Sequence, residues 1–329
     1  MVVCNKREES SKRLLVIDVI KMLSAFLVVC HHFGHKTIFY DKITLLAVPI
    51  FMILSFMFLF KKLNKDFDIY RRIKKLFVPL FGSAVIYYIV YNFILNRNIF
   101  ISDFLWQTTF GHSPKLNQTM WFSNNLIFLT IFVYIFRKYF IKYPVISSII
   151  TLIISYILQY SGYNVLMFSG LREELKAPLG RLVEMLPFVA AGCLVARYNF
   201  REFFSKKKII LFIVGSYILL KLLKIHKVNG FAYSGFGVLF KSLFALICVN
   251  IVPFQKLSTS IQVVLSGMCK YTLGIYCFHR LTESCIHNFL ARINISETIY
   301  SCLIIYILTY GVCYLISKIP SKWTRMLVE

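Results

Sequence analysis

Residues Leu15–Phe33 read LVIDVIKMLSAFLVVCHHF, an apolar run that contains Asp18, Lys21 and His32. With about 20 residues, the run is long enough to cross a bilayer as one helix. Eleven residues separate Lys21 from His32, which makes three helical turns plus roughly 20°, so both lie on one face. Asp18 lies three residues before Lys21, on nearly the same face. Because ionisable groups inside a membrane helix are costly to keep, this stripe is a candidate functional site.

The composition indicates a polytopic, all-α membrane protein. The chain has 329 residues, of which 58% are hydrophobic and 16% are charged, and its mean hydropathy is +0.69. A soluble domain has about 45–50% apolar and about 25% charged residues. The first apolar run is long enough to span and no small-residue cleavage site follows it, so no cleavable signal peptide is expected.

The net charge of +24 does not indicate a nucleic-acid partner, because most Lys and Arg lie in short loops between apolar runs. With the amino terminus inside, the inner segments carry about twice as many basic residues as the outer ones, which predicts cytoplasmic amino and carboxyl termini. We expect about ten helices in one bundle and a single domain over 1–329, with no appended soluble domain. The predicted spans are 14–33, 44–60, 76–95, 120–136, 144–160, 182–196, 208–223, 231–252, 271–290 and 298–316.

Cysteine and histidine spacing gives little support for a metal centre. The nine cysteines contain no CxxC pair and lie mostly in apolar runs, where a thiol behaves as a small hydrophobe. His31 and His35 are four residues apart and can share a helix face, but no third ligand is indicated. We therefore expect no metal site.

The first helix allows two interpretations. In one, His32 is a general base for proton transfer near neutral pH, and Asp18 or Lys21 orients a cofactor or stabilises charge in the same channel. In the other, Asp18 and Lys21 reach the inner interface as a surface pair and His32 marks the outer interface.

A basic cluster precedes the third apolar run, in the sequence IYRRIKKLFVPLF. Arg71, Arg72, Lys74 and Lys75 at a helix amino terminus are suited to a phosphate-rich ligand. Ordinary positive-inside retention explains the same pattern equally well.

Polar or aromatic residues in three later spans are further candidates. Tyr276 and His279 share a face and can close a hydrogen bond in the bundle or make a plain helix contact. Arg181 and Glu184 either pair and cap a helix or line the outer mouth. Trp121 is either a pocket residue or an interfacial anchor.

In their order, these features resemble acyltransferase family three, membrane proteins that transfer acyl groups, usually acetyl, onto surface glycans. Two positions depart from the family pattern. Phe56 replaces the Gly that follows Ser55 and is expected to block close helix approach, and Thr119-Met120 replaces His-Leu. The matching residues are Asp18, Lys21, His32 and Phe33; Phe51–Phe56 with Ser55; Arg71, Arg72, Lys74, Lys75, Leu76 and Pro79; Trp121 and Phe122; and Gly274, Tyr276 and His279.

The resemblance implies a cytoplasmic acyl-CoA donor, expected to be acetyl-CoA, and a glycan acceptor in the envelope of a bacterial cell, with the protein in the inner membrane. His32 would deprotonate the acceptor hydroxyl or assist an acyl relay. Membrane lipid and polysaccharide synthesis machinery are expected partners, and no permanently bound cofactor is expected. The implied residues are His32, Asp18 and Lys21 as catalytic; Arg71, Arg72, Lys74 and Lys75 as donor-binding; and Ser55, Trp121, Arg181, Glu184, Tyr276 and His279 as further pocket residues.

Other functions remain open from the sequence. A polysaccharide exporter or flippase has the same aromatic content, and an O-succinyltransferase of a biofilm glycan system differs only in the acyl group. A structural subunit of a synthase complex needs no base at His32.

Overall fold

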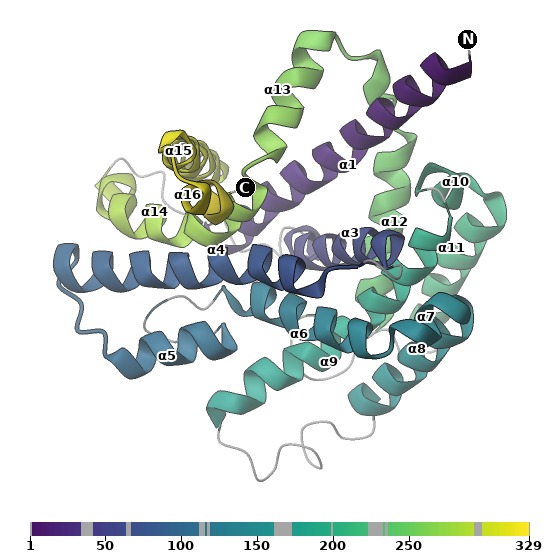
Figure 1. The fold of residues 1–329 in the computed structure, drawn as a ribbon, viewed down its shortest axis with the longest axis horizontal. Helices are drawn as coiled ribbons and strands as arrows, with labels where there is room; N and C mark the ends of the chain where they lie inside the picture. Colours follow the sequence, from purple (N-terminus) through teal and green to yellow (C-terminus); the bar gives the residue numbers. More distant parts are fainter. Residues whose placement is uncertain are drawn as a thin grey trace. The chain divides into compact units, whose positions relative to one another are not determined.

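The part of the chain that the structure, a computed structural model, describes is mostly helical and contains no strands (Figure 1). The described residues are 2–33, 42–63, 67–111, 116, 119–160, 173–198, 200–222, 233, 236–292 and 298–328. His35, considered above as a metal ligand with His31, lies outside them. The all-α fold class is confirmed.

Each predicted span coincides with a helix. Within the described residues, five helices are long and apolar enough to cross a membrane, or six if α13 (Thr259–Cys269) and part of α14 form one span with a 63° bend. Three other apolar helices are shorter. The protein is thus a polytopic membrane protein, and the number ten stays a prediction. The helices are α1 (Val2–Phe33), α3 (Ala47–Lys62), α4 (Ile69–Ile89), α6 (Trp121–Ile135), α8 (Pro144–Tyr160), α9 (Glu173–Arg197), α11 (Lys207–Leu222), α12 (Phe236–Ile251), α14 (Thr272–Arg292) and α15 (Ile299–Lys318).

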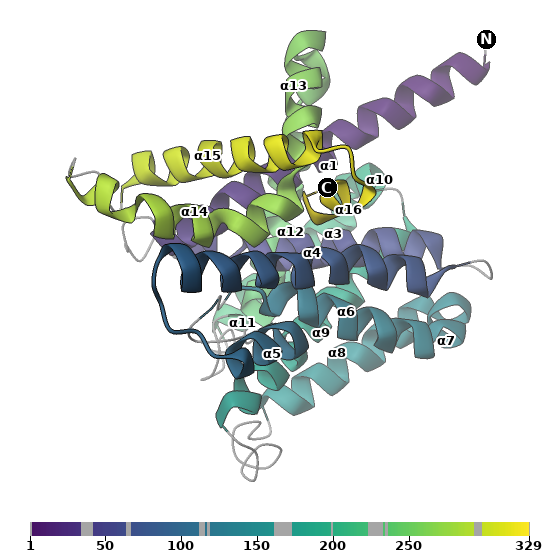
Figure 2. The ribbon, with the colours of Figure 1, turned by 60° about the vertical axis from the view of Figure 1, so that its left-hand side comes forward.

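The chain divides into two compact units, 1–47 with 245–329, and 48–244. In the first unit, α1 packs against α13, α14 and α15, and the short α16 (Lys322–Val328) packs against α14 and α15. Figure 2 shows α14 and α15 running side by side. In the second unit, α6 packs against both α4 and α9, and α8 packs against α9. The single domain expected over 1–329 stays a prediction.

The basic cluster lies inside α4 and not in the loop before it, because this helix begins at Ile69, seven residues before the predicted span. Asp68 caps the helix, with its Oδ1 accepting the backbone N–H of Arg71 at 3.0 Å. Lys and Arg are good helix formers, so the helix runs through the cluster, and it continues past Pro79 to Ile89. The first turns of α4 therefore present the cluster from a regular backbone.

The predicted outer loop 96–119 contains a helix, α5 (Ile101–Phe110), which packs against α4 and α6. The Asp103 carboxylate accepts the Phe100 N–H at 3.1 Å and caps its start. Gly111 ends it in the left-handed region with φ 67°, and a Cβ there would lie 2.6 Å from the Met120 carbonyl oxygen. The glycine therefore permits both the turn and the close approach of α5 to α6.

The expectation that Phe56 blocks close helix approach is wrong. Phe56 is fully buried, and Gly192 of α9 lies directly against it. A Cβ at Gly192 would lie 2.6 Å from the Phe56 Cβ and 2.9 Å from the Ile53 carbonyl oxygen. The helices approach closely here because the missing Cβ is on α9, opposite the phenylalanine.

Candidate active site

A small cavity beside His32 is the centre of the candidate site in the first unit. We call it the histidine cavity; its volume is about 90 Å³. A water molecule occupies about 30 Å³ in the liquid, so the cavity has room for a few waters or one reacting group. Its lining residues are His32, Phe33, Arg280, Glu283, His287, Leu290, Ser301 and Ile305.

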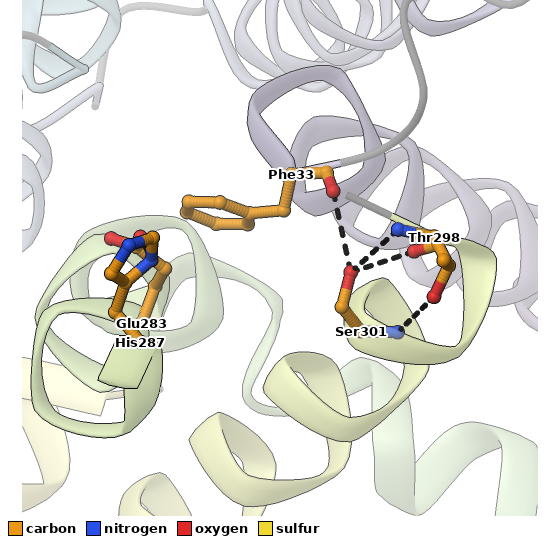
Figure 3. A network of polar contacts seen from close by, with 5 residues as sticks. All are labelled: Phe33, Glu283, His287, Thr298 and Ser301. Carbon is orange, nitrogen blue, oxygen red and sulfur yellow. Dashed lines mark hydrogen bonds and ion pairs between the residues drawn. The ribbon is translucent and has the colours of Figure 1, made fainter. Parts of the chain in front are cut away.

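A side chain of α15 holds the end of α1 by a hydrogen bond to a backbone carbonyl. The Ser301 hydroxyl donates to the Phe33 carbonyl at 3.3 Å and to the Thr298 carbonyl at 2.7 Å (Figure 3). Thr298 in turn caps α15 by accepting the Ser301 N–H. These bonds hold the last turn of α1, and with it His32, at the edge of the histidine cavity.

Three charged or titratable residues of α14 face the same cavity. Arg280 lies over the Phe33 ring, 5.3 Å from its centroid. One turn on, Glu283 Oε1 is 3.1 Å from His287 Nδ1, and the Phe33 ring points toward this pair (Figure 3). The pair is partly open to the exterior, with 60% of the His287 side chain and 18% of the Glu283 side chain exposed. The cavity thus combines a base, a cation and a carboxylate.

His279 contacts the His32 ring, and Tyr276 contacts His279 in turn. The His279 ring stacks on His32 with the centroids 5.4 Å apart and the planes at 27°, and it meets Phe33 edge-on at 5.9 Å. Its Nδ1 is 3.0 Å from the Ile275 carbonyl and 2.8 Å from the Tyr276 carbonyl. Both residues are buried, and the Tyr276 ring is 6.2 Å from that of His279. The predicted bond between the two residues is made by the Tyr276 backbone.

Asp18 and Lys21 face a different neighbour from His32. The Cys269 thiol of α13 donates to Asp18 Oδ1 at 3.3 Å, and the charges of Asp18 and Lys21 both act on that thiol. Neither residue lines the histidine cavity. Asp18 and His32 are 14 residues apart, which is about 21 Å along a helix. The predicted stripe therefore contacts two separate sites along α1, Cys269 near Asp18 and the histidine cavity at His32.

The second unit contains a larger cavity at the start of α4, which we call the basic cavity. Its volume is about 620 Å³. Five cationic side chains and a single carboxylate line it, so it favours an anionic ligand. Lys74 is absent from its lining and lies over the Tyr70 ring at 6.0 Å. The lining residues are Lys61, Lys62, Phe67, Asp68, Arg71, Arg72 and Lys75.

Hydrogen bonds to neighbouring helices hold the Arg72 side chain at the basic cavity. Its Nη2 donates to the Ser55 hydroxyl at 3.0 Å and to the Ser55 carbonyl at 3.3 Å, and its Nε donates to the Thr130 hydroxyl at 3.4 Å. None of these bonds uses Nη1, so that nitrogen can serve a ligand. Ser55, predicted as a pocket residue, therefore acts by orienting Arg72.

Trp121 and Glu184 are buried elsewhere in the second unit, where Trp121 contacts the half-buried Arg181. The Arg181 guanidinium lies over the Trp121 ring, 4.5 Å from its centroid. The centroids of the Tyr233 and Trp121 rings are 5.5 Å apart. Only 6% of Trp121 is exposed, which favours a pocket residue over an interfacial anchor, and its role stays a prediction.

The sequence interpretation missed several lining residues. Arg280, Glu283 and His287 follow one another at helical spacing within a predicted span, which is a signal that could have found them. Lys61 and Lys62, at the end of α3, also line the basic cavity and were not among the predicted site residues. Among the described residues, no group of three or more His, Cys, Asp or Glu could hold a metal ion.

Taken together, the helices and these polar sites define a multi-pass membrane protein with a cavity lined mainly by cations in one unit and a cavity lined by histidines, an arginine and a glutamate in the other. The family model described as an acyltransferase domain, family 3, matches residues 14–318. Because this match covers nearly the whole chain, the chain belongs to acyltransferase family 3 and is a membrane acyltransferase. No curated protein and no solved structure matches the chain.

Proposed function

We propose that this protein moves an acyl group, acetyl in the first instance, from cytoplasmic acyl-CoA to a hydroxyl group of a cell-envelope or exported polysaccharide. In this reaction the hydroxyl oxygen bonds to the thioester carbonyl carbon and the C–S bond breaks. His32 takes the hydroxyl proton, and coenzyme A leaves as the thiol once its thiolate has received a proton. Atoms and charge therefore balance without a further reactant.

The observation that carries the proposal is the position of His32 at the histidine cavity. An imidazole has the right basicity to accept a hydroxyl proton near neutral pH. Arg280, in the same cavity, supplies positive charge for an oxyanion. The volume of about 90 Å³ is well below the about 300–1,000 Å³ of pockets that enclose a whole ligand, so the acceptor would insert only its reacting group.

The basic cavity supports a coenzyme A donor. Coenzyme A carries phosphate groups, and five cations at the end of α3 and the start of α4 offer them ion pairs. Arg72 is held by Ser55 and Thr130 before any ligand arrives, so its binding geometry costs little entropy. The basic residues near this cavity also support cytoplasmic termini and residence in the bacterial inner membrane.

The test is mass spectrometry of the surface polysaccharide from cells that carry the wild type, His32→Ala or His31→Ala. His31 is the matched control, because it lies on the same helix next to His32. Its Nδ1 is 3.1 Å from the Thr44 hydroxyl, and it does not line the histidine cavity. The proposal predicts that only His32→Ala removes the acyl groups while polymer export continues.

Two outcomes would contradict the proposal. Loss of exported polymer with normal acylation of what remains would indicate an exporter or flippase. An unchanged polysaccharide in His32→Ala cells with normal protein amounts would indicate a structural subunit of the synthesis machinery. The mass of the lost group distinguishes acetyl from succinyl.

A further inference from the structure

His279 is a fully buried histidine whose hydrogen bonding is incomplete. Its exposed fraction is 0%. A carbonyl oxygen only accepts, so the two backbone carbonyls at Nδ1 place the proton on that nitrogen. A buried, unpaired charge costs far more than a buried neutral ring, so the imidazole is neutral and Nε2 carries a lone pair.

That lone pair has no hydrogen-bond partner among the described residues, and the Nε2 atom is buried. An unsatisfied buried acceptor costs about 1–3 kcal/mol, so a protein that keeps one calls for an explanation. A buried leucine or phenylalanine would fill the space without this cost. The acceptor therefore points to an N–H or O–H donor that reaches it during function.

His32 is a group with this chemistry that contacts the His279 ring. The two rings stack at 5.4 Å, and His32 and Phe33, both in contact with the His279 ring, line the histidine cavity. Once His32 has accepted a proton, both of its ring nitrogens carry N–H groups, and only one of them faces the substrate. In the stacked arrangement the in-plane N–H groups of His32 do not point at the His279 lone pair, so this hydrogen bond forms only when the His32 ring turns out of the stack.

We propose that His279 is a positioning residue for His32, whose buried Nε2 accepts the remaining N–H of His32 and so stabilises the imidazolium that proton transfer creates. This inference rests on the proposed function. The backbone carbonyls of Ile275 and Tyr276 fix the tautomer, as a carboxylate does for the histidine of other catalytic pairs. A neutral partner suits this place, because Arg280 already supplies a positive charge to the cavity.

Two substitutions at His279 separate the acceptor from the packing. His279→Phe keeps a ring against His32 but removes the acceptor, whereas His279→Gln removes the ring and offers an amide oxygen near the place of Nε2. Phe278→Leu is the matched control, because Phe278 is the buried chain neighbour and has no polar atom in its side chain. All variants are purified in detergent and assayed with acetyl-CoA and the polysaccharide, alongside thermal unfolding.

We expect His279→Phe to lower kcat at least tenfold and to change the KM of either substrate by less than about threefold. The loss of log kcat in His279→Gln should be at least one third smaller than in His279→Phe. Phe278→Leu should lower stability but keep the wild-type kcat. In wild-type protein with ¹⁵N-labelled histidine, one histidine signal, absent from His279→Gln, should show a protonated Nδ1 and an unprotonated Nε2. This spectrum tests the proposal even if His279→Phe does not fold.

The proposal is overturned if His279→Phe keeps wild-type kcat, if both His279 variants lose activity only in proportion to stability, or if the spectrum shows the opposite tautomer. Wild-type transfer combined with any of these results leaves the proposed function standing. A wild type that transfers no acyl group overturns the proposed function itself, and this inference with it.

Discussion

Replacing Arg72 by lysine should weaken coenzyme A binding far more than the same change at Arg71. Both substitutions keep the charge, and both residues line the basic cavity. Arg72 is held by three hydrogen bonds to Ser55 and Thr130, whereas the Arg71 side chain is exposed. A lysine has one nitrogen and no planar fork, so it cannot keep this geometry and reach a phosphate at the same time.

The size of the effect follows from these contacts. Two of the Arg72 bonds are long, at 3.3 and 3.4 Å, so we count the equivalent of one charge-assisted bond, about 2 kcal/mol. At about 1.4 kcal/mol per tenfold, the Kd of coenzyme A should rise about thirtyfold. For Arg71→Lys, an exposed ion pair of about 0.5 kcal/mol predicts a rise of about twofold.

The assay is isothermal titration calorimetry of coenzyme A into each purified variant in detergent, with thermal unfolding as the check on folding. A Kd that rises equally for Arg71→Lys and Arg72→Lys would refute the role of the Ser55 contacts. An unchanged Kd in both folded variants would mean that the basic cluster serves membrane topology alone.

Two further predictions use the same preparations. Gly192→Ala should lower the free energy of unfolding by about 1–3 kcal/mol, because its Cβ would lie 2.6 Å from that of Phe56; Gly215→Ala, which has open space around the new Cβ, should leave stability unchanged or raised by about 0.5–1 kcal/mol. Equal stability of the two variants would show that α9 does not approach Phe56 closely. Raising NaCl from about 0.1 M to about 1 M shortens the Debye length from about 10 Å to about 3 Å, so the Kd of coenzyme A should rise at least about tenfold. The matched ligand, acetyl-pantetheine without phosphates, should show no such dependence, and equal salt dependence of both ligands would exclude phosphate recognition in the basic cavity.

Helical periodicity and apolar length were sufficient to predict the all-α membrane fold and the approximate place of the helices, whereas the number of spans stays a prediction. The basic cluster was also recognisable, and the structure brings Arg71, Arg72 and Lys75 together in one cavity. The position of the cluster inside α4 could not be predicted, because the start of this helix depends on the Asp68 cap. That cap is a weaker sequence signal than the apolar run.

Contacts between helices were much harder to predict. A helical face shows that Asp18 and His32 point the same way, but it does not show which helix lies opposite each residue. The structure gives Asp18 a thiol from α13, and it gives His32 a cavity shared with α14 and α15. Similarly, Phe56 suggested a blocked contact because the compensating glycine, Gly192, is distant in the sequence.

The central claim is that His32 serves acyl transfer from coenzyme A to a carbohydrate hydroxyl. The most direct measurement is the transfer of radiolabelled acetyl from acetyl-CoA to the polysaccharide by the purified protein. We predict label in the polysaccharide with the wild type and with His31→Ala, and a loss of at least about a hundredfold with His32→Ala, since general-base catalysis contributes 10²–10⁴-fold. Transfer by folded His32→Ala at the wild-type rate would contradict the account.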